Sequence, residues 1–133
     1  MKYIFICFLI CCSSCELVRI GTGSSGLVNP TQETSIGTVY LLKAELDSGN
    51  IIGASELLIH PNGKQMKAKE RYEQFATLEK LGYAIQKKDI AYSQTDTLSA
   101  SKHSITCSFN YLNTCTFTLL KANDSWFISD IKE

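Results

Sequence analysis

Two cysteines near the end of the chain, Cys107 and Cys115, have a spacing that fits a disulfide across a hairpin. Apolar residues alternate with serine and threonine on both sides of a short loop at residues 110–112. If that loop joins two antiparallel strands, Cys107 lies opposite Cys115 and Ile105 lies opposite Phe117, all on the apolar face. Opposed strand positions come within disulfide range, so we predict a disulfide. Two separate buried thiols are the alternative.

A third cysteine, Cys15, ends a pattern typical of an exported protein. Lys2 is followed by an apolar run over residues 4–12, then by Ser13, Ser14 and the cysteine. The run is too short to cross a bilayer, but it has the length of the apolar core of a secretory signal. The cysteine after two small residues resembles a bacterial lipobox. We therefore predict that residues 1–14 are a signal peptide and that Cys15 is acylated, for example with palmitate. A plain secretory signal cut elsewhere, or a cytosolic start, is the alternative.

Acylation of Cys15 would hold the protein to a membrane by lipid alone. The expected location is the cell envelope, and within it the outer membrane of a Gram-negative bacterium. Cys107 and Cys115 would then lie in an oxidising compartment, where disulfides persist. Residues 15–28 are rich in glycine and serine and predict a flexible tether between the anchor and a folded domain.

Five further side chains are candidates for a pocket in that domain. Asp130 is expected on the same strand face as Trp126, where a carboxylate facing a hollow has a raised pKa and can act as a base. Such a carboxylate near a chain end more often reaches solvent. Tyr40, Tyr72 and Tyr111 can contact a ligand, although core packing with the hydroxyl at the rim is the commoner role. Trp126 can line the pocket or close the core.

Metal and nucleic-acid chemistry are not favoured. His60 and His103 lack companions at the spacing of metal ligands, so we predict no metal site and no cofactor. Lys2 is the only charged residue among residues 1–14, so their removal leaves 12 basic against 13 acidic side chains. A chain without basic excess has no electrostatic attraction for nucleic acid.

The elements that would position the candidate residues fall into two halves. Apolar residues at helical spacing predict three helices, from Asn29-Pro30 to residue 47, over residues 51–59, and over residues 65–81 with a stop at Gly82. After Gly82 the period changes to two, which predicts antiparallel strands joined by short turns. Residues 29–133 therefore read as one α+β domain, with three helices packed on a sheet of about four strands.

The order of elements resembles the cone-shaped nuclear transport factor 2-like superfamily. The resemblance is carried by Asn29-Pro30, by the helix pair joined through residues 46–50 with Ala54 following, by the third helix and by the closing run over residues 126–128. In particular, the chain is similar to small uncharacterised bacterial lipoproteins of the group likened to lumazine-binding domains. The resemblance implies a strongly bent sheet around an open cone. It implies no catalytic residues, because none of the enzyme motifs of the superfamily matches here.

Fold alone does not assign a function, so we weigh three hypotheses. The first is a non-catalytic, lipid-anchored module that binds a small apolar or amphipathic molecule or a protein, with a homodimer through the sheet as one form of protein partner. The second is a small enzyme of the isomerase or dehydratase type that uses Asp130 or a tyrosine as acid and base. The third is an assembly factor that acts through protein contact alone.

Overall fold

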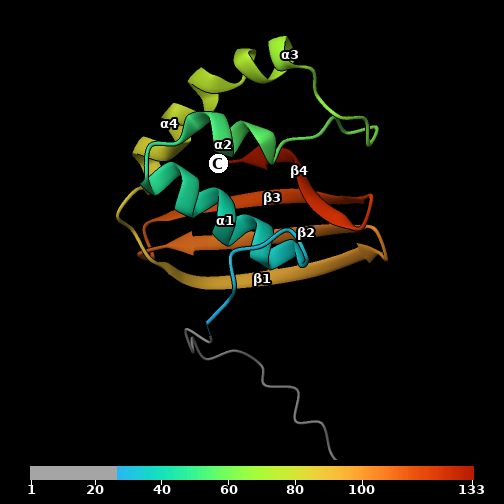
Figure 1. Ribbon diagram of the computed structural model, residues 1–133. Coiled ribbons are helices and arrows are strands. Elements are labelled where there is room, and N and C mark those ends of the chain that lie inside the picture. Colours follow the sequence, from blue (N-terminus) through green and yellow to red (C-terminus); the bar gives the residue numbers. More distant parts are fainter. Residues whose placement is uncertain (1–26) are drawn as a thin grey trace, which may run out of the picture.

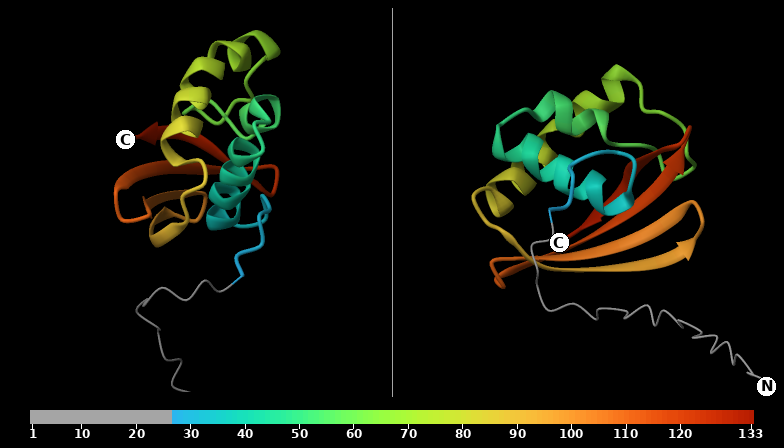
Figure 2. Two further views of the ribbon diagram at one scale, coloured as in Figure 1. Left: turned by 90° about the vertical axis from the view of Figure 1, so that its left-hand side faces the viewer. Right: turned by 60° about the horizontal axis from the view of Figure 1, so that its bottom comes forward.

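The computed structural model describes residues 27–133, which form one α+β domain (Figure 1). Its helices are α1 (Ser35–Asp47), α2 (Ile51–Glu56), α3 (Ala68–Glu73) and α4 (Phe75–Ile85). Its strands are β1 (Ile90–Ser99), β2 (Lys102–Phe109), β3 (Asn113–Ala122) and β4 (Ser125–Lys132). The strands make one antiparallel sheet in the order β1-β2-β3-β4, and the helices lie over one of its faces (Figure 2).

The predicted α+β class and four-stranded antiparallel sheet are therefore confirmed. The predicted signal peptide (residues 1–14), the acylated Cys15 and residues 15–26 of the predicted tether lie outside the described residues. Within the described residues, no helix is long and apolar enough to span a membrane.

The third predicted helix is wrong in detail, because it consists of two helices that meet at Gln74. This residue ends α3 and precedes α4, and its N–H bonds to the carbonyl of Arg71 at 3.0 Å, a tighter turn than in an α-helix. α3 buries no residue, whereas α4 buries Leu78 and Ile85. Of these two helices, only α4 therefore packs into the core. The described domain has four helices and not three.

The predicted helix stop at Gly82 is also wrong, since α4 continues to Ile85. Gly82 is buried, and a Cβ placed there would meet Leu46 Cδ2 of α1 at 3.7 Å. This is an ordinary van der Waals distance, so the packing of α1 on α4 leaves room for a Cβ at Gly82. The left-handed residue that follows the helix is Lys87, with a φ of 58°.

The first two helices are present but shorter than predicted, α1 at its start and α2 at its end. α1 starts later than predicted, with Thr34 as its N-cap, whose hydroxyl accepts a hydrogen bond from Gly37 N at 3.0 Å. Asn50 caps α2 as predicted, with a bond of 3.1 Å from Gly53 N. α2 ends at Glu56, and the next residues run beside β4, where Ile59 N–H bonds to the carbonyl of Ile128 at 2.9 Å.

The core lies between the helices and the helix-facing side of the sheet. The predicted register of β2 and β3 is confirmed, with Cys107 opposite Cys115 and Ile105 opposite Phe117. The alternate residues carry hydroxyl groups on the outer face, where Thr106 and Thr116 are in hydrogen-bond contact at 3.2 Å. The buried sheet residues of the core are Ile105, Cys107, Phe109, Cys115, Phe117, Leu119, Trp126 and Ile128.

A β-bulge interrupts the alternation of β4. Leu119 pairs with Ile128, but its neighbour Thr118 pairs with Asp130, so Ser129 is an extra residue in β4. The bulge returns Ile131 to the core side, where it packs against the core. The prediction that Asp130 shares a face with Trp126 is therefore wrong, because the bulge moves Asp130 to the outer face beside Thr118.

Candidate functional site

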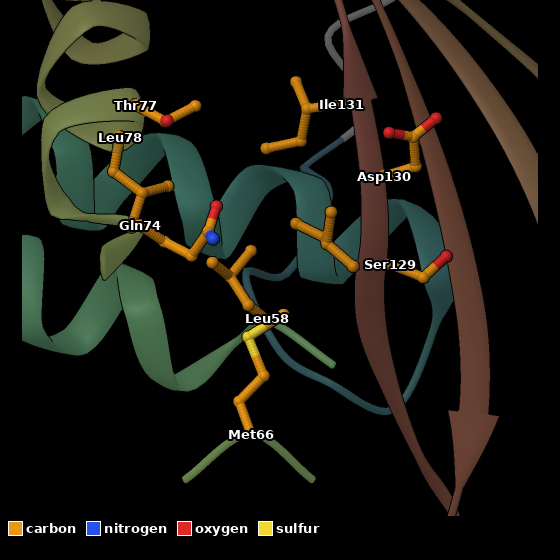
Figure 3. A pocket seen from close by; sticks show the side chains of 9 residues that line it. Leu58, Met66, Gln74, Thr77, Leu78, Ser129, Asp130 and Ile131 are labelled. Carbon is orange, nitrogen blue, oxygen red and sulfur yellow. The ribbon is translucent and has the colours of Figure 1, made fainter. Parts of the chain in front are cut away.

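A cavity of about 210 Å³ lies between α4 and β4 (Figure 3). Its wall is about equally polar and apolar, and the polar lining residues are Gln74, Thr77, Ser129 and Asp130. The apolar lining residues are Leu58, Met66, Leu78, Ile128 and Ile131.

Neutral polar groups surround the opening of this cavity. Gln74 points from the helix layer toward β4, and Ile131 points from β4 toward the helices (Figure 3). Neither the amide of Gln74 nor the hydroxyl of Thr77 hydrogen-bonds to another residue among 27–133. Both side chains can therefore donate to and accept from a bound molecule.

The backbone of Ile131 adds a donor and an acceptor at the same place. Along the free edge of β4, the peptide groups of Trp126 bond to Gln32, and those of Ile128 bond to Leu57 and Ile59. After the bulge, the next residue whose peptide groups face this edge is Ile131. Its partner Phe117 turns its own peptide groups toward β2, so those of Ile131 point away from β3. No partner for them occurs in residues 27–133.

Asp130 does not serve this cavity as an acid or base. Its side chain is 50% exposed, and its Oδ2 lies 3.7 Å from Lys132 Nζ on the outer face. Figure 3 places Asp130 and Ser129 on the side of β4 away from the labelled helix residues.

The predicted pocket tyrosines lie apart from one another and from the cavity. Tyr72 is 71% exposed and packs on Phe75, and Tyr111 is 80% exposed. Tyr111 occupies a left-handed position of the β2–β3 turn, with a φ of 60°, which turns its side chain outward. Tyr40 is half-buried on α1, where burial, and secondarily the charge of Cys107, raises its pKa.

Trp126, also predicted for the pocket, is buried in the core and belongs to a polar link that sequence reasoning missed. Its ring stacks on His103 at 4.2 Å, and His103 Nδ1 lies 2.7 Å from Ser35 Oγ. The Trp126 carbonyl accepts from Gln32 Nε2 at 2.9 Å and from Thr38 Oγ1 at 3.4 Å. These contacts fasten the start of α1 to β2 and β4.

The contact between Ser35 and His103 does not make a nucleophile site. Ser35 is buried, and no carboxylate among residues 27–133 bonds to His103 to orient it. We interpret the pair as a structural link. Ser35 and His103 lie 68 residues apart, so no local motif pointed to their contact.

The predicted disulfide is not present, since Cys107 and Cys115 are free thiols in the structure. The N–H of Lys121 in β3 donates to the carbonyl of Ser101, which precedes β2. Every second residue of β3 from Lys121 back to Cys115 therefore turns its peptide groups toward β2. Cys107 and Cys115 are thus a hydrogen-bonded pair, in which Cβ atoms are farther apart than in the other kind of pair. A disulfide needs a Cβ separation of about 3.5–4.5 Å.

The buried position of the thiols also suppresses their ionisation. Burial, with a smaller contribution from Cys115, raises the pKa of Cys107 to about 12. Burial, followed by the charge of Glu133, raises the pKa of Cys115. A thiol that stays protonated is a poor nucleophile and metal ligand, so the pair acts as two small apolar core residues.

The second histidine is a surface contact and does not belong to a metal site. His60 Nε2 lies 3.2 Å from Glu70 Oε2, and the Lys67 N–H donates to the same oxygen at 2.6 Å. The Lys67 N–H first, and His60 second, lower the pKa of Glu70. In the part of the chain that the structure describes, no three acidic, histidine or cysteine side chains come close enough together to hold a metal ion.

No family model, curated protein or solved structure matches this chain. The resemblance to the nuclear transport factor 2-like superfamily therefore stays a prediction.

Proposed function

We propose that the protein is a lipid-anchored, non-catalytic module of the cell envelope, and that the cavity between α4 and β4 binds a small amphipathic molecule. The observation that carries the proposal is a preformed cavity whose wall combines apolar side chains with the neutral polar groups of Gln74 and Thr77. Its volume of about 210 Å³ is below the roughly 300–1,000 Å³ of sites for drug-sized ligands. The ligand is therefore small, or inserts one short branch.

The chemistry of the lining defines the ligand further. Leu58, Met66 and Leu78 offer contacts to a short hydrocarbon group, whose burial is the main favourable term. The Gln74 amide, the Thr77 hydroxyl and the Ile131 peptide offer hydrogen bonds without charge. A ligand with an uncharged amide or hydroxyl head fits this set better than a carboxylate or an ammonium, whose desolvation would be uncompensated.

The enzyme hypothesis lacks a group to carry it. It needs an acid or base directed into the cavity, but the carboxylate of the lining residue Asp130 turns to the outer face beside Lys132, and the three tyrosines do not line the cavity. We also propose the finer fold class, a cone of the nuclear transport factor 2-like type. The helices before a four-stranded meander, all on one face of the sheet, support that assignment.

Filling the cavity should abolish binding while the fold is kept. Thr77 is exposed on α4, so Thr77→Phe can place its ring in the opening without disturbing the core. We expect the affinity for hexanamide, measured by NMR titration of the full chain, to fall at least about tenfold, as for a loss of about 1.4 kcal/mol. Hexanoate and hexylammonium should bind the unchanged protein more weakly than hexanamide.

Ala76→Phe is the matched control, because Ala76 is the exposed neighbour on α4 and does not line the cavity. Its affinity for hexanamide should equal that of the unchanged protein. The proposal is overturned if hexanamide shows no saturable binding, or if both phenylalanine variants weaken it alike.

The lipid anchor depends on one thiol, which gives a second test. In cells of a Gram-negative host fed labelled palmitate, the unchanged chain should take up label and fractionate with membranes. Cys15→Ser should take up none, because no other residue follows the pattern of a lipobox. Cys7→Ser, within the predicted signal, should be labelled like the unchanged chain. A labelled Cys15→Ser variant would show that the anchor is elsewhere.

A further inference from the structure

The edge strand β1 presents an unprotected row of backbone groups. It lies at the margin of the sheet opposite β4, and no described element lies beyond it (Figure 1). All residues from Tyr92 to Ser99 are exposed. Natural edge strands are commonly blocked by lysine, proline, short length or β-bulges. β1 has ten residues and neither lysine nor proline, and its two register shifts lie near its ends, between Ile90 and Tyr92 and between Thr97 and Ser99, so that the stretch from Tyr92 to Thr97 is regular.

The register of the sheet tells which peptide groups of β1 face outward. Cys107 and Ile105 bond to β3, so their β1 partners, Ser93 and Thr95, turn their own N–H and C=O groups away from β2. Thr97, opposite His103, follows the same alternation. Among residues 27–133, none of these three residues has a backbone partner on the outer side.

We propose that β1 pairs antiparallel with β1 of a second copy of this chain, about a two-fold axis at Thr95. The pairing joins two four-stranded sheets into one continuous sheet. Thr95 then lies opposite Thr95 of the partner subunit, and Ser93 lies opposite Thr97 of the partner subunit. Ser93, Thr95 and Thr97 all have outward peptide groups, so three hydrogen-bonded pairs form, each exchanging two bonds.

The side chains of β1 complement one another in this register. Tyr92 and Leu98, which are 47% and 58% exposed, lie at the two ends of the regular stretch, Leu98 at the register shift that follows Thr97. In the proposed pairing, Tyr92 comes beside Leu98 of the partner subunit. Aromatic and aliphatic residues opposite each other stabilise antiparallel pairs. Gln94 lies opposite Asp96 of the partner subunit, which repeats across the axis the bond of 3.2 Å that Gln94 makes to Asp96 within one chain.

The neighbouring registers that keep the hydrogen-bond alternation are worse. Moving the axis to Asp96 places its carboxylate opposite the partner's Asp96, and like charges in one row are destabilising. Moving the axis to Gln94 places Tyr92 opposite the partner's Asp96 and Leu98 opposite the partner's Ile90. Only the axis at Thr95 matches both the apolar and the polar rows.

Disulfide trapping in cells that produce the full chain tests this register. One chain carrying Tyr92→Cys and a second chain carrying Leu98→Cys are produced together in the same cells. The mixture is oxidised with copper–phenanthroline and oxygen and run on non-reducing gels. The oxidant takes two electrons and two protons from the paired thiols. We expect a covalent dimer from the mixture, and at least tenfold less from either variant alone or from the unchanged chain.

Two interface substitutions, each introduced into both single-cysteine chains, distinguish specific pairing of β1 from random collision of two chains. Thr95→Pro removes an outward N–H at an edge position where proline is tolerated, and Gln94→Asp faces each new carboxylate with Asp96 of the partner subunit. Each should lower the trapped dimer at least tenfold, whereas Thr95→Val and Gln94→Asn should not. The proposal is overturned if the single-cysteine chains trap as well as the mixture, or if Gln94→Asp, whose exposed side chain leaves the fold intact, traps fully. The proposal is also overturned if the mixture gives no trapped dimer because another protein, or residues 1–26, covers β1.

Discussion

Between pH 9 and 12, the unchanged protein should lose about 4 kcal/mol more unfolding free energy than the variant Cys107→Ala. The thiol of Cys107 is fully buried, and its pKa rises from 9.0 to about 12 in the folded state. Three pH units correspond to about 4 kcal/mol at 1.36 kcal/mol per unit. In this window the unfolded chain has lost the proton and the folded chain keeps it, so stability falls as pH rises. Below pH 9 both states are protonated and the contribution is complete.

Urea unfolding at a series of pH values, in the presence of a reductant, measures this difference. The other ionisable groups are common to both proteins and cancel in the comparison, apart from the smaller of the two contributions to the raised pKa of Tyr40, which comes from the charge of Cys107. Cys107→Ala has its own cost from the smaller side chain, which is independent of pH and appears as a constant offset. Parallel stability curves for the two proteins would show that Cys107 is not protected from water, and the core assignment of β2 would be wrong.

The register of β2 and β3 could be predicted from the sequence because two independent signals agree. Alternation fixes which side chains face the core, and the short loop after Phe109 fixes which residues are opposite. The same signals do not tell whether a row is hydrogen-bonded. That depends on the turn geometry, here with Asn110 and Tyr111 both at positive φ. The pairing of Cys107 with Cys115 was therefore predictable, and its suitability for a disulfide was not.

The bulge in β4 and the break at Gln74 escaped prediction for a different reason. Residues 126–131 read Trp-Phe-Ile-Ser-Asp-Ile, so the apolar residue after Ile128 comes three positions later at Ile131, but Ser129 carries no glycine or proline signal for an extra residue. Residues 65–81 likewise keep helical spacing through Gln74. In both places the deviation is imposed by packing against a distant element, which overrides the local pattern.

The cavity could not be predicted because its wall comes from three separate segments. Leu58 follows α2, Thr77 lies on α4, and Ile131 reaches the cavity only through the bulge in β4. Single-residue candidates such as Asp130 and Tyr111 were chosen for their chemistry, but their position depends on the bulge and on the turn. The sequence predicted the helices and strands around the cavity better than it predicted the residues that line it.

Phe117→Ala should destabilise the domain by about 3–5 kcal/mol, the usual range for a buried phenylalanine. Phe117 is fully buried at the centre of β3, opposite Ile105 on one side and Ile131 on the other. Truncation leaves a cavity that the paired strands cannot close, because their backbone positions are fixed by hydrogen bonds on both sides. With a typical total stability of about 5–15 kcal/mol, a large part of the variant is expected to unfold at moderate temperature.

Thr116→Ala is the matched control, one residue away on the outer face of the same strand. It removes the contact of 3.2 Å to Thr106 and some preference for a strand, and should lose no more than about 1.5 kcal/mol. Urea unfolding of both variants at neutral pH gives the comparison. Because side chains alternate, a register moved by one residue would exchange the two faces and reverse the order of the two losses. A larger loss for Thr116→Ala would therefore refute the sheet register, and with it the outward peptide groups on which both the cavity at Ile131 and the pairing of β1 depend.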